Sequence, residues 1–121
     1  MSDVAEITEL MQTYFDGLFF SDADKLRAAF HASAHLLGVD KGALVDEPAE
    51  AWFERVAGRE SPSAKGFVQD DAILSLDFNG PDSALAKVKV TVFGVVYVDY
   101  LALLRFSEGW RVINKSYACH G

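Results

Sequence analysis

The spacing of apolar residues changes once along this chain, near Phe67, and that change limits the folds open to it. Before this point apolar residues recur three and four apart, which is typical of helices with one buried stripe. After it they alternate, and every second residue from 84 to 92 is Ala or Val, which is typical of strands. We therefore expect helices gathered on one side of an antiparallel sheet, which is an α+β domain.

Turn and capping residues divide the first half of the chain into three expected helices and a short hairpin. Asp3 is the expected N-cap of the first helix, Ser21 of the second and Asp46 of the third. The expected elements are helices over 3–20, from Ser21 to near His31 and from Asp46 to Gly58, short strands over 34–39 and 43–45, and long strands over 72–78, 84–92, 95–106 and 110–118. At 121 residues the chain forms one domain, residues 1–121, which can bury a core without disulfides.

Charge and composition exclude several classes of partner. The formal net charge of −7 repels phosphate backbones, so we expect no nucleic-acid partner. No run of Lys or Arg favours an anionic membrane, and no stretch approaches the roughly 20 apolar residues of a membrane span. Cys119 is the only cysteine, and the N-terminal stretch is acidic, unlike a signal peptide. We therefore expect a cytoplasmic protein.

The last predicted hairpin, residues 95–118, is apolar on both faces. A three-residue loop would place Phe106 opposite Trp110 and Tyr100 opposite Ser116, so that even-numbered residues share one face. An antiparallel sheet with one face in water normally alternates apolar and polar residues cleanly. Because the helices can cover only one face, we expect a second copy of the chain to cover the other, which makes the protein a homodimer.

We assign the odd-numbered face of this hairpin to the dimer interface and the even-numbered face to the core side. The interface residues are then Tyr97, Asp99, Leu101, Leu103, Ile113, Lys115 and Tyr117. Asp99 and Lys115 lie diagonally across the hairpin, and we expect a structural ion pair between them. The residues expected to line a pocket between helices and sheet are Tyr14, Leu18, His31, Trp52, Tyr100, Asn114 and Ser116. Such a cavity suits a small planar ligand, although the same aromatics could instead fill the core.

Two stretches of the chain resemble known proteins. Residues 14–38, YFDGLFFSDADKLRAAFHASAHLLG, resemble the opening of nuclear-transport-factor-2-like (NTF2-like) proteins. Residues 99–117, DYLALLRFSEGWRVINKSY, resemble the closing hairpin of one branch, the putative lumazine-binding NTF2-like family. The resemblance implies a curved sheet wrapped around helices, a cone-shaped pocket and a homodimer through the outer sheet face. It implies little about chemistry, because this fold carries many functions.

Ketosteroid isomerases of the same superfamily use a general-base Asp, with a Tyr and a protonated Asp as oxyanion donors. The chain resembles them without gaps from Tyr14 onward, and Tyr14 falls where their oxyanion Tyr lies. In that resemblance the base position falls on Gly38 and the second donor position on Ala102. Asp99 is three residues from Ala102, on the opposite face in our assignment, so we do not take it as a replacement. We expect no ketosteroid isomerase activity.

The histidines offer two further candidates. His31 and His35 stand four residues apart, the spacing of a metal-binding pair on a helix. The helix is expected to end near His31, which breaks that geometry, and no third ligand is evident, so we predict no metal and no cofactor. His31 could act as a base, as in some NTF2-like dehydratases, or simply lie favourably at a helix end.

Three functions therefore remain open from the sequence. The first is a homodimer that binds a small hydrophobic or planar molecule without assigned catalysis. The second is a hydratase, dehydratase or isomerase that acts on a small hydrophobic substrate through Tyr14 and His31. The third is a dimeric interaction module whose cone is filled. An open cone with converging polar groups favours the first two, and a packed cone favours the third.

Overall fold

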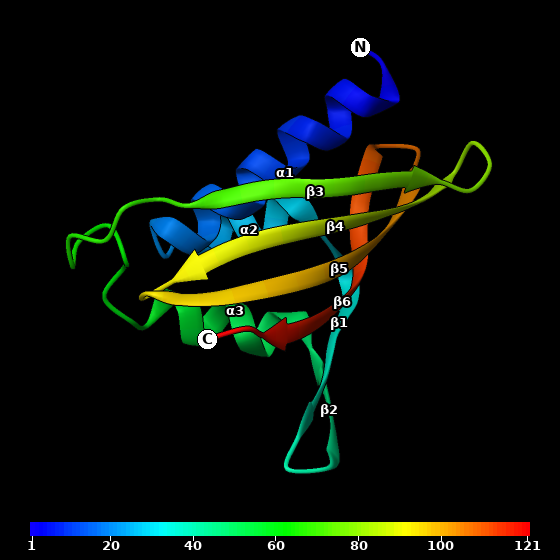
Figure 1. Cartoon of the computed structure of the whole chain (residues 1–121). Helices are drawn as coiled ribbons and strands as arrows, with labels where there is room; N and C mark the ends of the chain where they lie inside the picture. The colour runs from blue at the N-terminus through cyan, green and yellow to red at the C-terminus, as the bar shows by residue number, and fades with distance from the viewer.

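Three helices pack against one face of a six-stranded curved sheet in the computed structural model, which describes residues 1–121 (Figure 1). The elements are α1 (Asp3–Phe19), α2 (Ala23–Ala29), β1 (Phe30–Asp40), β2 (Ala43–Pro48), α3 (Ala49–Ala57), β3 (Asp71–Phe78), β4 (Ser83–Val92), β5 (Val95–Phe106) and β6 (Gly109–Cys119). This order confirms the predicted α+β cone. None of the three helices combines the length and apolar character that crossing a bilayer requires.

The sheet brings the two ends of the sequence together. Its strand order is β2-β1-β6-β5-β4-β3, so the first long strand lies beside the last. The β1–β6 pair is parallel, whereas all other neighbours are antiparallel. In Figure 1 the long strands cross over the helices, which lie together behind the sheet. The space between helices and sheet is therefore bounded by residues from both halves of the chain.

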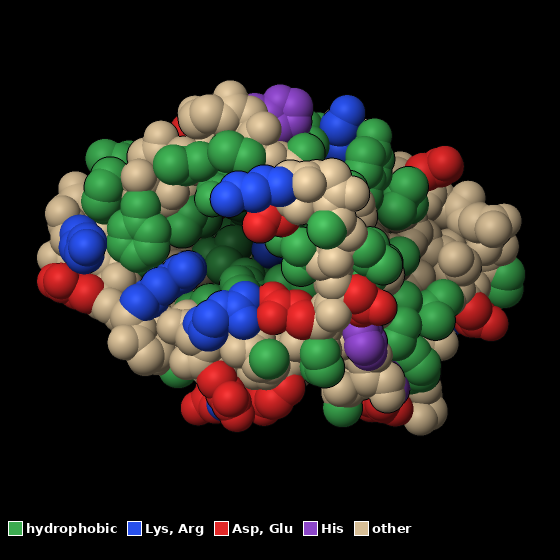
Figure 2. Space-filling view, turned by 90° about the horizontal axis from the view of Figure 1, so that it is seen from below, with side chains coloured by type: hydrophobic (Ala, Val, Ile, Leu, Met, Phe, Trp, Pro, Cys, Tyr) green, Lys and Arg blue, Asp and Glu red, His purple; other side chains and the backbone are tan.

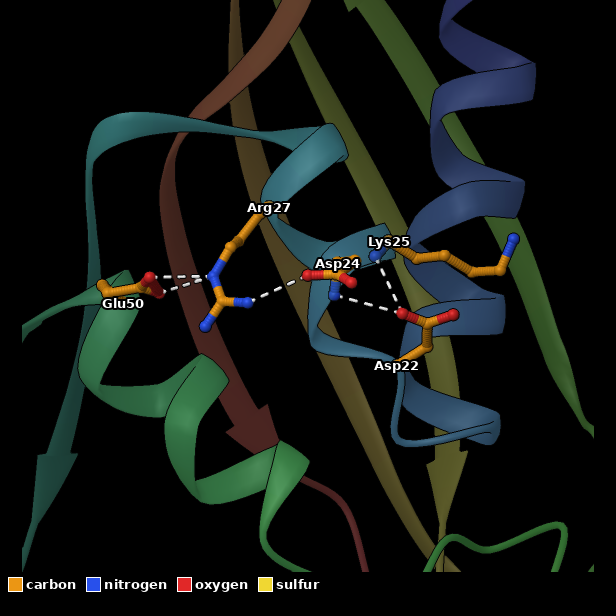
Figure 3. Close-up of polar contacts among 5 residues, drawn as sticks. All are labelled: Asp22, Asp24, Lys25, Arg27 and Glu50. Carbon is orange, nitrogen blue, oxygen red and sulfur yellow. Dashed lines mark hydrogen bonds and ion pairs between the residues drawn. The ribbon is translucent and has the colours of Figure 1, made fainter.

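The helix ends differ in detail from the predicted caps. Ser2, one residue before Asp3, caps α1 by accepting a hydrogen bond from the amide of Ala5 at 3.1 Å. Asp22 rather than Ser21 caps α2, accepting from the amides of the next turn (Figure 3). Asp46 does not begin α3, because the chain stays extended as β2 through Pro48 and the helix starts only at Ala49.

An ion-pair bridge holds the two short helices together. Arg27 near the end of α2 reaches Glu50 at the start of α3 at 2.8 Å, and its other side contacts Asp24 at 3.1 Å (Figure 3). All three side chains are largely exposed, so solvent screening leaves the bridge little free energy to contribute. It marks the contact between α2 and α3, where α3 closes one side of the cone.

The register of the last hairpin overturns the predicted loop. Two residues, Ser107 and Glu108, connect the strands, and Gly109 pairs with Phe106, so Trp110 lies opposite Arg105. A bulge at Ile113 then restores the expected pairs Ala102–Asn114 and Tyr100–Ser116. The two-residue loop places Trp110 and Val112 on the same face as Leu101 and Leu103, and all four side chains are fully buried.

The assignment of the two hairpin faces was therefore wrong. The odd-numbered residues of β5 face the helices, where Asp99, Leu101 and Leu103 are inaccessible to solvent. The even-numbered residues face outward, where Tyr100 is 47% and Leu104 is 36% exposed. Both faces carry apolar residues, so the hairpin alone does not reveal which face the helices cover. The two-residue loop adds Trp110 and Val112 to the odd face, where both are buried against the helices.

Candidate functional site

An open cavity of about 190 Å³ lies between the helices and the inner face of the sheet. Figure 2 looks into this hollow, whose floor is apolar and whose rim carries Lys and Arg side chains. The lining residues come from seven helices and strands and from the segment just after α3: Leu18, Leu36, Glu47, Trp52, Arg55, Arg59, Val90, Val92, Tyr97, Lys115 and Tyr117. The cone is thus not filled by its own side chains.

A buried polar cluster lies next to the cavity. The hydroxyl of Tyr14, on α1, donates a hydrogen bond of 2.6 Å to Oδ2 of Asp99, on β5. Lys115 of β6 places Nζ 3.8 Å from the same oxygen. Both Tyr14 and Asp99 are inaccessible to solvent, and Oδ1 of Asp99 has no partner. Of the three, only Lys115 lines the cavity.

Aromatic rings enclose the Lys115 ammonium. Nζ lies 4.0 Å from the ring centroid of Trp52, 5.4 Å from that of Tyr14 and 5.8 Å from that of Tyr117. Cation–π contacts of this kind, strengthened by desolvation, partly replace the hydration that the ammonium loses on burial. Trp52 and Tyr117, which both line the cavity, thus place aromatic surfaces close to a cationic group.

Burial and mutual contact shift the ionisation of this cluster. The pKa of Tyr14 is raised well above its usual value, mainly because burial disfavours the phenolate, and then because Asp99 repels the phenolate and accepts a hydrogen bond from the neutral hydroxyl. The pKa of Lys115 is lowered, mainly by burial, which outweighs the attraction of Asp99; repulsion from Arg59 adds to the lowering. Tyr14 is therefore a protonated donor committed to Asp99 over the neutral pH range.

Four predicted pocket residues lie away from the cavity wall. Tyr100, Asn114 and Ser116 lie on the outer face of the sheet, as the corrected register requires. His31 stacks on Phe106, with ring centroids 4.6 Å apart, and lines a separate surface hollow. Leu18 and Trp52 line the cavity as predicted, and Tyr14 lies directly beneath it, 6.5 Å from Trp52 between ring centroids.

The residues predicted for the dimer interface belong instead to the interior of the cone. Tyr97, Lys115 and Tyr117 line the cavity, and Asp99, Leu101 and Leu103 are buried around it. Ile113 is the half-buried bulge residue. The predicted ion pair between Asp99 and Lys115 is confirmed, but it lies inside the cone and not on its outer surface.

Arg55, Arg59 and Glu47 line the cavity but were not predicted from the sequence. The sequence does contain a pattern that indicates which face of β5 points inward. The turn after β4 has only two residues, Phe93 and Gly94, so even-numbered residues of β4 pair with odd-numbered residues of β5. The even residues of β4 are Ala and Val throughout, whereas the odd ones include two lysines. Extending that clean alternation across the short turn would have placed the odd face of β5 inside.

The histidine pair does not form a metal site. His31 and His35 both lie on the strand β1, and strand residues four apart are separated by roughly 13 Å. His35 pairs with Asp46 at 2.7 Å, while Nδ1 of His31 accepts from the amide of Ser33. No three His, Cys, Asp or Glu side chains are placed to share a metal ion.

The residue beside Tyr14 differs from the one predicted by the resemblance to ketosteroid isomerases. Asp99 lies on the inner face in direct contact with Tyr14, so it, and not Ala102, occupies the position beside the tyrosine. At the position of the catalytic base this chain has Gly38, which carries no acid, and the structure leaves no room there for a side chain. A Cβ added to Gly38 would lie 2.9 Å from Cζ of Tyr117, whose ring fills that space. Asp40 is exposed beside the turn of the β1–β2 hairpin.

Solved structures of other proteins match this fold over nearly the whole length of the chain. An NTF2-like protein of unknown function from Shewanella baltica OS155 is 27% identical, with a TM-score of 0.86 over 98% of this chain and 94% of that one. A second, from Silicibacter pomeroyi DSS-3, is 24% identical, with a TM-score of 0.84 over 97% and 95% of the two chains. A ketosteroid isomerase-like protein from Erwinia carotovora atroseptica is 14% identical, with a TM-score of 0.73 over 99% and 98%.

Sequence comparison narrows this likeness to one family. No curated protein matches the chain. The family model described as "Putative lumazine-binding" matches residues 2–118, which is nearly the whole chain. The chain therefore belongs to the putative lumazine-binding family of NTF2-like proteins.

Proposed function

We propose that this protein binds a small, planar, largely apolar molecule in the cone cavity. The observation that carries the proposal is the open cavity of about 190 Å³, walled by Trp52, Tyr97 and Tyr117. Flat aromatic walls with a few polar groups suit a flat ligand, since they bury its faces and leave its edges to hydrogen bonds. An interaction module with a filled cone has less support, because the side chains leave this space open.

Calorimetric titration with a panel of planar compounds tests the proposal. The panel contains lumazine, naphthol, naphthoate and naphthamide, and at least one of them is expected to bind the wild-type protein. Val92→Phe places a larger side chain on the cavity wall and is expected to abolish that binding. Val98→Phe, on the outer face of β5, is the matched control and is expected to leave it unchanged. Binding that survives Val92→Phe would contradict the proposal.

A homodimer through the outer face of the sheet is the second part of the proposal. The helices cover the inner face of the sheet and leave the apolar side chains of Leu85, Tyr100 and Leu104 exposed on the outer face. These side chains lie on the adjacent strands β4 and β5 and form one apolar strip. A second copy related by a twofold axis would bury the strip against its own equivalent.

Sedimentation tests the dimer directly. The wild-type protein is expected to sediment as a dimer at micromolar concentration, and Leu104→Asp, which places a charge in the strip, as a folded monomer. A wild-type monomer would contradict the dimer without touching the ligand proposal.

The enzyme alternative has weaker support. Tyr14 is inaccessible to solvent and already donates its hydrogen bond to Asp99, so its hydroxyl is not available to polarise a substrate carbonyl in this arrangement. His31 lines a different hollow and cannot act together with Tyr14 on one small substrate. A hydratase, dehydratase or isomerase built on these two residues is therefore not the function that we propose.

A further inference from the structure

The charges around the cavity do not balance. Its lining carries three cationic side chains, Arg55, Arg59 and Lys115, and one acid, Glu47. This excess of positive charge occurs in a protein whose net charge is −7. Figure 2 shows several Lys and Arg side chains around the hollow.

Two of the three cations already have a counter-ion. Arg55 forms a bidentate pair with Glu47, with N–O distances of 2.6 and 2.8 Å. Lys115 faces the buried carboxylate of Asp99. These two pairs neutralise four of the charged groups in and beside the cavity. Arg59 is the cation of the cavity lining that remains without a counter-ion.

Arg59 has no acidic partner. Its side chain is half-buried, and its Nε is shielded from solvent without any hydrogen-bond acceptor. Burial lowers the pKa of the guanidinium; Tyr97 offsets part of this lowering, and nearby Arg55 adds to it. The guanidinium makes a cation–π contact with Phe93, 5.2 Å from Cζ to the ring centroid. Its place just beyond the C-terminus of α3 also favours a cation.

These compensations do not satisfy the Arg59 donor. A cation–π contact and a helix end stabilise the guanidinium charge, but neither supplies an acceptor to Nε. A buried donor without an acceptor is itself unfavourable, because it has lost its hydrogen bonds to water. A carboxylate entering the cavity would provide the missing acceptor and the missing charge in one group, since a guanidinium binds a carboxylate through two parallel hydrogen bonds.

We propose that the ligand of the cone is a planar monocarboxylic acid whose carboxylate pairs with Arg59 while its apolar body packs between Trp52, Tyr97 and Tyr117. This inference rests on the proposed ligand-binding function and adds the chemical class of the ligand. One uncompensated cation selects a single negative charge, because a dianion would leave one charge desolvated and unpaired. Lys115 does not compete for the carboxylate, since Asp99 already neutralises it.

The test compares an acid with its neutral isostere. Naphthoate and naphthamide have nearly the same shape, so calorimetric dissociation constants for the two isolate the contribution of the charge. The wild-type protein is expected to bind naphthoate at least about tenfold more tightly than naphthamide, as a charge-assisted pair predicts. In Arg59→Gln the two affinities are expected to converge, with the naphthamide affinity changed less than about twofold.

Two further variants guard against a folding artefact. Arg59→Lys keeps the charge but loses the bidentate geometry, and it is expected to retain only part of the preference for naphthoate. Arg105→Gln removes an arginine that pairs with Asp82 outside the cavity, and it is expected to keep the full preference. Far-ultraviolet circular dichroism and thermal unfolding confirm that each variant is folded before it is titrated.

The outcomes separate this inference from the function on which it rests. Equal binding of naphthoate and naphthamide by the wild-type protein overturns the carboxylate inference and leaves ligand binding in the cone intact. A preference for naphthoate that Arg59→Gln does not reduce also overturns it. If no member of the planar panel binds the wild-type protein, both the function and the inference fail.

Discussion

The hydroxyl of Tyr14 donates a 2.6 Å hydrogen bond to Asp99, a residue 85 positions later in the chain, and neither side chain is accessible to solvent. This bond joins α1 to the central strand β5 through the middle of the core. It commits the tyrosine proton to a carboxylate that Lys115 also faces. The cluster thus stabilises the wall of the cavity and does not offer its donors to a ligand.

Removing the Tyr14 hydroxyl should destabilise the fold. Tyr14→Phe takes the only hydrogen-bond donor from Asp99, whose other oxygen is already without a partner. The expected loss is about 1–3 kcal/mol in the free energy of unfolding, measured by urea denaturation. Tyr100→Phe is the control, because that side chain is 47% exposed on the outer face and its hydroxyl should matter by less than about 0.5 kcal/mol. Equal losses in the two variants would contradict the role given to Tyr14.

The same tyrosine sets an alkaline limit on stability. Burial, followed by the neighbouring Asp99, raises the pKa of Tyr14 above that of an unfolded chain. The folded state therefore keeps a proton that the unfolded state releases above about pH 10. This contribution to stability is complete below that value and is lost as the pH rises through the folded pKa. Urea midpoints across the alkaline range should fall more steeply for the wild-type protein than for Tyr14→Phe; parallel curves would contradict the assignment.

The Asp99–Lys115 pair should show strong coupling. Lys115→Met leaves the Asp99 carboxylate buried without its cation, at an expected cost of about 3–5 kcal/mol. Asp99→Asn leaves the buried ammonium without its anion and should also be costly. The double variant removes both charges, so its loss should be smaller than the sum of the single losses, with a coupling of about 0.5–3 kcal/mol. Additive losses in a double-mutant cycle would show that the two groups do not interact.

The architecture was predictable from local patterns, whereas the site was not. Periods of helical spacing and of alternation give the element order, and the resemblances over residues 14–38 and 99–117 give the fold family. The site depends on which face of β5 the helices cover, and the two-residue turns at 93–94 and 107–108 relate that face to the faces of β4 and β6. The strand pairing around Asp99 and Lys115 agrees with the predicted register, so these two residues were placed outside only because both faces of the hairpin are apolar and the alternation of β4 was not extended across the turn at 93–94.

Two adjacent leucines test this face assignment. Leu103 is fully buried and Leu104 is 36% exposed, although both lie in the middle of an apolar run in β5. Leu103→Asp should unfold the chain or cost at least about 3 kcal/mol, because it buries an unpaired charge. Leu104→Asp should leave the chain folded, with a far smaller change in its thermal midpoint. The reverse order of stabilities would restore the face assignment that the structure overturns.

The two tryptophans give the most direct test of ligand binding in the cone. Trp52 is half-buried on the cavity wall, whereas the indole of Trp110 is fully buried elsewhere in the core and donates to Asp3 at 3.0 Å. Their indole N–H signals in a two-dimensional NMR spectrum therefore report separately on the cavity and on the rest of the core. Titration with naphthoate is expected to shift the Trp52 signal progressively and leave the Trp110 signal in place. A Trp52 signal that stays fixed at saturating naphthoate, or shifts that fall instead on the outer face around Tyr100, would contradict binding in the cone.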